Sequence, residues 1–115
     1  MRVLTNINKA ETSNLQGKVN MMCHAISDRT VSLSGEAHSP DVVTITITCA
    51  GIRGTMSKTM VMSKISTPLI GKDGEFHTAW HAWINGYEYE LASFAEFQSV
   101  VKRQVNLIKP LVQSR

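Results

Sequence analysis

Residues 76 to 109 read FHTAWHAWINGYEYELASFAEFQSVVKRQVNLIK, and this stretch decides the fold. Apolar and polar residues alternate on both sides of Asn85-Gly86, a dipeptide typical of the two-residue turn of a β-hairpin. The register of such a turn puts six residues on one face, namely Trp80, Ala82, Ile84, Tyr87, Tyr89 and Leu91. The other face receives His81, Trp83, Glu88 and Glu90. We predict that the first face belongs to the core and that the second is exposed.

A helix is expected directly after the hairpin. Ser93 and Glu96 have the spacing of a capping box, in which the two residues satisfy free backbone amides of the first helical turn. An apolar stripe with helical spacing follows, made of Phe97, Val101, Val105 and Ile108. Pro110 disfavours helical conformation at the residue before it. The pattern therefore predicts a helix over residues 93 to 109 that ends near Ile108.

Three strands are expected before the hairpin. Residues 42 to 49 alternate β-branched apolar residues with threonines, which is typical of a half-exposed antiparallel strand. Residues 55 to 65 return after a glycine-containing turn, with methionines on one face. Residues 29 to 34 are expected to form a short strand through Val31 and Leu33. Prolines and glycines predict loops at residues 35 to 40 and 67 to 74.

The N-terminal region carries two competing patterns. Residues 13 to 26 repeat apolar side chains at helical spacing, and Ser13 with Gln16 matches a capping box. Alternation over residues 19 to 25 also fits a strand, and Gly17 costs about 1 kcal/mol relative to alanine inside a helix. The count of matching positions favours the helix. Residues 1 to 12 are polar and aperiodic, so we expect a flexible arm there.

These elements predict an α+β fold: an antiparallel sheet of about four to six strands, the C-terminal helix packed on one face, and a second, N-terminal helix. At 115 residues the chain fits one domain, expected over residues 13 to 115. No apolar run approaches the roughly 20 residues of a membrane span, and no secretion signal is recognisable. Two cysteines are too few for a disulfide scaffold. We therefore expect a cytoplasmic protein with free thiols and no membrane contact.

The sequence offers weak support for catalysis or metal binding. His77 and His81 lie about 13 Å apart along a strand, beyond joint coordination of a metal ion. His81 lies across from Glu90 in the hairpin register, yet no nucleophile occupies a recognisable motif beside them. We expect no metal, no cofactor and no enzymatic activity.

Trp83 is the residue that most suggests a function, because the register puts a large aromatic side chain on the polar face of the hairpin. Together with His81, Glu88 and Glu90 it predicts a partner-binding surface. The interpretation is a non-catalytic module that acts through protein contacts. It includes a homo-oligomer, an adaptor, and a stoichiometric inhibitor of the kind that mobile elements encode.

A separation of charge supports an alternative function. Residues 75 to 96 contain no lysine or arginine, whereas residues 97 to 115 contain no acidic residue and carry four cations: Lys102, Arg103, Lys109 and Arg115. The chain has a net charge of +3 at pH 7. A basic helix can bind phosphate, although cations near a helix C-terminus also stabilise the helix itself. The alternative is therefore a nucleic-acid-binding domain.

Overall fold

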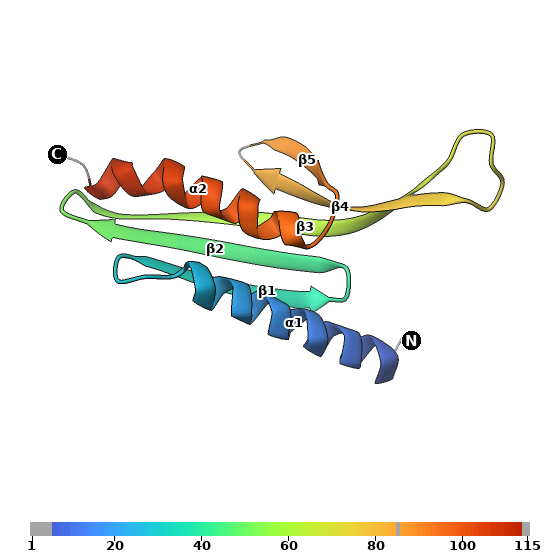
Figure 1. Cartoon of the computed structure of the whole chain (residues 1–115), viewed down its shortest axis with the longest axis horizontal. Coiled ribbons are helices and arrows are strands. Elements are labelled where there is room, and N and C mark those ends of the chain that lie inside the picture. Colours follow the sequence, from blue (N-terminus) through green and yellow to red (C-terminus); the bar gives the residue numbers. More distant parts are fainter. Residues whose placement is uncertain (1–5, 85, 114–115) are drawn as a thin grey trace.

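The computed structural model describes residues 6–84 and 86–113 and contains a five-stranded antiparallel sheet with two helices (Figure 1). In chain order the elements are α1 (Asn6–Ile26), β1 (Val31–Ser39), β2 (Val42–Gly51), β3 (Gly54–Pro68), β4 (Phe76–Ile84), β5 (Tyr87–Leu91) and α2 (Ala95–Gln113). Each strand pairs with the next, so the sheet order is β1-β2-β3-β4-β5. The expected α+β class, with a helix packed against the sheet, is confirmed.

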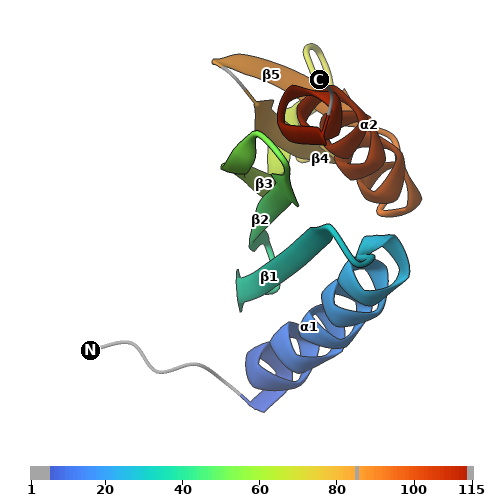
Figure 2. The same cartoon turned by 90° about the vertical axis from the view of Figure 1, so that its left-hand side faces the viewer.

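Both helices lie on the same side of the sheet, as Figure 2 shows, and the opposite face has no helix over it. We call that opposite face the open face. On β2, the buried side chains Val43, Ile45, Ile47 and Cys49 alternate with threonines that face the open side. Both cysteines are free and buried, and burial raises the pKa of each thiol. Period-two alternation thus separates a core face from an open face.

The ambiguous N-terminal segment is helical, and α1 begins earlier than expected. It starts at Asn6, so residues 6–12 belong to a helix rather than to a flexible arm, while residues 1–5 lie outside the described residues. Leu15, Val19, Met22 and Cys23 are its buried residues. The segment forms a helix rather than a strand because helical spacing places these four side chains on one face, where they pack on β1.

The prediction of a loop at residues 35 to 40 is wrong, because β1 continues to Ser39. A Cβ atom added at Gly35 would lie 2.4 Å from Val19 Cγ1 and 2.7 Å from Ile45 Cδ1. Gly35 is therefore a strand residue that lets α1 approach the sheet, and not a loop signal. The strand expected to end at residue 65 likewise continues, to Pro68.

The helix end expected near Ile108 is also wrong, because α2 passes through Pro110 and reaches Gln113. Tertiary contacts hold the additional turn. Val112 is buried, its carbonyl accepts the Arg53 N–H at 2.8 Å, and the Gln113 side chain donates to the Ala50 carbonyl at 3.2 Å.

At the N-terminal end of α2, Glu96 Oε1 accepts the Ala92 N–H at 2.5 Å, and the Glu96 N–H donates to the Ser93 carbonyl at 3.1 Å.

The predicted hairpin register is confirmed, with Ile84 opposite Tyr87, Ala82 opposite Tyr89 and Trp80 opposite Leu91. Gly86 has a positive φ of 82°, as the turn requires, and Asn85 lies outside the described residues. The assignment of the whole first face to the core is wrong for the tyrosines, however: Tyr87 is 67% exposed and Tyr89 is 47% exposed. α2 packs mainly on β2 and β3, and on this side of β5 Leu91 is buried while the two tyrosines stay exposed.

Candidate protein-binding edge

The two edges of the sheet differ in how their backbone groups are satisfied. At β1, the Gln16 side chain of α1 donates to the Gly35 carbonyl at 3.0 Å and accepts the Ala37 N–H at 2.7 Å. Ser27 Oγ accepts the Leu33 N–H at 3.0 Å, and the Asp28 N–H donates to the Val31 carbonyl at 2.8 Å. α1 and the residues that follow it therefore close the outer edge of β1.

At β5, the outward backbone groups belong to Glu88 and Glu90. The two residues that flank a two-residue turn exchange both of their backbone hydrogen bonds, so Tyr87 bonds to Ile84 of β4. Bonding alternates along an antiparallel pair, so Tyr89 and Leu91 also bond to β4. The N–H and C=O groups of the two glutamates consequently point away from β4. Among the described residues, no other segment donates to or accepts from them. We call these groups the open edge of β5.

The helix side of this edge carries exposed apolar side chains. Tyr87 and Tyr89 project from β5. Leu107 and Leu111 are also exposed, at 58% and 56%, one helical turn apart on α2. We call Tyr87 and Tyr89 the apolar border. A water-exposed group of large side chains beside an unpaired strand is typical of a contact surface.

The open face beside the edge holds two pairs of histidine and glutamate. His77 Nε2 lies 2.9 Å from Glu90 Oε2, and His81 Nδ1 lies 2.5 Å from Glu88 Oε2. The His81–Glu90 pair expected from the register is present at 4.0 Å, so Glu88 is the nearer partner of His81. The hydrogen bond from His77 lowers the pKa of the Glu90 carboxyl. The sequence analysis did not include His77 in the site. Its place on the same strand face as His81, four residues away, could have been predicted from the alternation of β4.

Trp83 lies on the open face as expected, but it is half-buried. Its ring stacks on His81 with the ring centroids 6.0 Å apart and an interplanar angle of 26°. The ring of Trp83 is therefore partly buried by its own chain, whereas the sequence analysis expected a partner to bury it. The surface predicted from Trp83, His81, Glu88 and Glu90 is contiguous, because His81 contacts the other three residues.

One of the basic residues of the alternative function, Lys109, is paired within the chain. Its Nζ lies 3.2 Å from Asp28 Oδ2. Backbone hydrogen bonding from Thr30 lowers the pKa of Asp28 to about 2, with further help from Lys109. Lys102 and Arg103 are exposed on α2. Arg115 lies outside the described residues.

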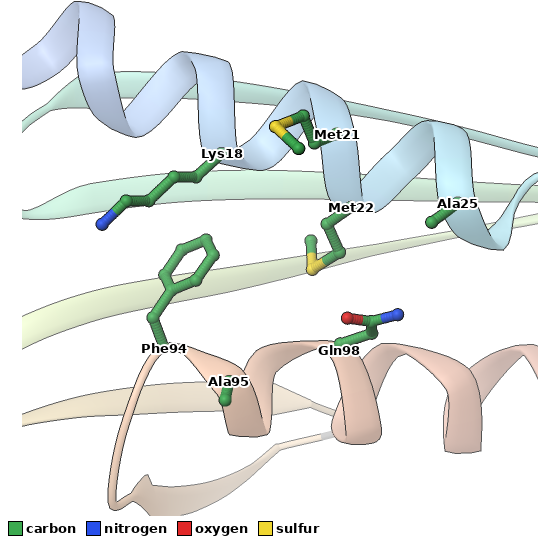
Figure 3. A pocket seen from close by; sticks show the side chains of 7 residues that line it. All are labelled: Lys18, Met21, Met22, Ala25, Phe94, Ala95 and Gln98. Carbon is green, nitrogen blue, oxygen red and sulfur yellow. The ribbon is translucent and has the colours of Figure 1, made fainter.

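A second surface feature, missed in the sequence, is a groove between α1 and α2 (Figure 3). It has a volume of about 420 Å³ and is lined mainly by apolar side chains and the stem of a lysine: Lys18, Met21, Met22, Ala25, Phe94, Ala95 and Gln98. The Lys18 ammonium lies 5.8 Å from the centre of the Phe94 ring, so it borders the groove. No sequence pattern indicates this groove, because one wall comes from residues 18–25 and the other from residues 94–98.

Within residues 6–84 and 86–113, no three histidine, cysteine, aspartate or glutamate side chains are grouped as metal ligands would be. Neither helix of the described chain combines the length and the apolar character that a membrane crossing requires. The sequence matches no family model, and no curated protein or solved structure is significantly similar to the chain.

Proposed function

We propose that this chain is a non-catalytic binding module that acts through protein contacts, and that it associates with a second copy of itself through the open edge of β5. The observation that carries the proposal is the contrast between the two sheet edges. Side chains and loop groups of the same chain close β1, whereas β5 keeps the backbone groups of Glu88 and Glu90 free for another strand.

A two-fold axis through Tyr89 suits the length of β5. With antiparallel pairing, Glu88 of each copy lies opposite Glu90 of the other, and the outward N–H and C=O groups form two hydrogen-bonded pairs. The axis keeps both pairs of helices on the same side of the joined sheet. The helix side of the seam is then covered by the tyrosines of both copies.

The apolar border supports the same arrangement. Tyr87 and Tyr89 are exposed on the helix side of β5, so two copies bring four tyrosines together at the seam. Burial of such surface stabilises association by about 25 cal/mol for each Å² removed from water. Nucleic-acid binding by α2 has less support, because Lys109 is paired with Asp28.

Sedimentation equilibrium of wild-type protein and two variants tests the proposal. Glu90→Pro removes an outward N–H without removing a bond to β4. A dimer loses two seam hydrogen bonds in this variant, worth about 1–3 kcal/mol in total, so we expect roughly 5- to 160-fold weaker association.

Glu90→Gln is the matched control, because it removes the same charge but keeps the N–H. We expect it to associate at least as tightly as the wild type. Equal association of Glu90→Pro and Glu90→Gln, with both variants folded by circular dichroism, would show that the edge is not the contact.

A further inference from the structure

Pairing of two copies at the open edge of β5 brings like charges close together. Both of its outward-bonding residues are glutamates, and both side chains project from the open face. Any antiparallel register that pairs outward-bonding residues with one another places a glutamate of one copy opposite a glutamate of the other. Their Cβ atoms would lie about 5 Å apart, and like charges directly opposite each other destabilise a strand pair.

Two histidines stand directly behind these carboxylates. His77 is 2.9 Å from Glu90, and His81 is 2.5 Å from Glu88 and 4.0 Å from Glu90. Each copy therefore supplies two histidines for two glutamates. When both histidines are protonated, the net charge of these four side chains changes from −2 to zero, and the seam of two copies changes from −4 to zero.

No other described group on the open face offsets the glutamate charge. On the neighbouring strand β3, Thr67 lies opposite His77 and Ser63 lies opposite His81, and neither ionises. Ile65 and Val61 occupy the remaining positions beside β4. Lys64 belongs to the helix side, where its ammonium lies 5.6 Å from the Trp80 ring centre. The lowered pKa of Glu90 keeps that carboxylate charged over the range in which histidines titrate.

We infer that the partner at the open edge of β5 is a second copy of this chain and that protonation of His77 and His81 promotes this pairing. The inference rests on the proposed function and adds its control by pH. Histidine changes charge between about pH 5 and pH 8, so dimers form more readily at the acidic end of this range. The geometry puts the two histidine rings beside the two glutamates, so a positive charge on each ring would offset the repulsion between glutamates of two copies.

Sedimentation equilibrium at pH 5.5 and pH 8.0 tests the inference. For the wild type we expect dimerisation to be about tenfold tighter at pH 5.5. The double variant His77→Gln/His81→Gln cannot acquire the two positive charges, so it should associate weakly at both values. The double variant Glu88→Gln/Glu90→Gln has no seam repulsion, so it should dimerise equally well at both values.

His38→Gln is the matched control. His38 lies on β1 at the far edge of the sheet, where its nearest acidic neighbour is Glu36 at 3.6 Å. This variant should retain the full pH dependence of the wild type.

The possible failures are distinguishable. Wild-type dimers of equal strength at both pH values, or pH dependence that persists in His77→Gln/His81→Gln, would overturn the inference and leave the proposed function standing. If wild type and Glu88→Gln/Glu90→Gln are both monomeric at both values, the proposed function fails as well.

Discussion

Gln16 and Ala37 share a hydrogen bond of 2.7 Å that joins α1 to the outer edge of β1. The same side chain donates to the Gly35 carbonyl at 3.0 Å, so one amide replaces two partners that a neighbouring strand would supply. An Asn or Gln side chain can do this because its amide carries both a donor and an acceptor, as a peptide group does. Gln16 therefore satisfies two outward groups of β1, and Ser27 and Asp28 satisfy two more.

Gln16→Ala is expected to lower the free energy of unfolding by about 1–3 kcal/mol, because it leaves a part-buried N–H and C=O of β1 unpaired. Urea unfolding measures this change. Asn14→Ala, at an exposed position of α1, is the control and should change stability by less than about 0.5 kcal/mol. Equal effects of the two substitutions would contradict the role assigned to Gln16.

Two glycines should respond in opposite ways to alanine. Gly35→Ala places a Cβ 2.4 Å from Val19 Cγ1, so overpacking should cost about 1–3 kcal/mol. Gly17→Ala meets nothing within 4 Å inside α1 and should stabilise by up to about 1 kcal/mol. Thermal unfolding of the two variants compares them directly. A stabilising Gly35→Ala would show that α1 does not pack closely on β1.

Trp83→Ala should weaken self-association while the monomer stays folded, because Trp83 stacks on His81 and holds that ring beside Glu88. Trp80→Ala is the contrasting variant. Trp80 lies on the helix side, 4.9 Å from Phe97 between ring centres, so its loss should reduce monomer stability by at least about 1 kcal/mol more than Trp83→Ala does. Sedimentation and urea unfolding together separate the two effects. Unchanged association of Trp83→Ala would remove this residue from the contact.

The double variant Tyr87→Gln/Tyr89→Gln should weaken dimerisation by roughly tenfold or more, because the exposed surface of both side chains would become buried only in the dimer. Both are exposed in the single chain, so its unfolding free energy should change little. Ile70→Gln, at the fully exposed tip between β3 and β4, controls for the loss of a surface hydrophobic side chain. Similar loss of association in Ile70→Gln would mean that the apolar border has no special role.

Asp28 should make folding stability depend on pH at the acidic end. Hydrogen bonds from Thr30 and Val31, and the ion pair with Lys109, stabilise its charged form, and its pKa falls from an ordinary 3.8 to about 2. A folded-state pKa below the unfolded value means that the stabilisation is complete above about pH 4 and is lost as pH falls towards 2. Asp28→Asn should be less stable than wild type at pH 7, and the difference should shrink between pH 4 and pH 2 in urea unfolding. A constant difference across that range would contradict the assignment.

Local sequence patterns predicted the parts of the fold that depend on periodicity. The alternation around Asn85-Gly86 gave the correct pairing of Ile84 with Tyr87, and therefore the faces of Trp83 and Glu88. The stripe from Phe97 to Ile108 predicted the buried side of α2. These predictions succeeded because a side chain's face is set by its own position in a strand or helix.

Element ends were predicted less well, because partners far along the chain hold them. Arg53 and Ala50 bind the last turn of α2, so it continues past Pro110. Gly35 lies within a strand, and the Val19 side chain of α1 packs where a Cβ atom of residue 35 would lie. No window of neighbouring residues contains these partners.

The sequence by itself determined an antiparallel α+β arrangement and the orientation of the residues beside the β4–β5 turn, because both follow from short-range spacing. Only the tertiary structure decided that α1 closes one sheet edge, that α2 leaves Tyr87 and Tyr89 exposed, and that His77 joins His81 behind the two glutamates. Those features depend on where each helix lies over the sheet and on side-chain distances across strands, and such positions result from packing of the whole chain.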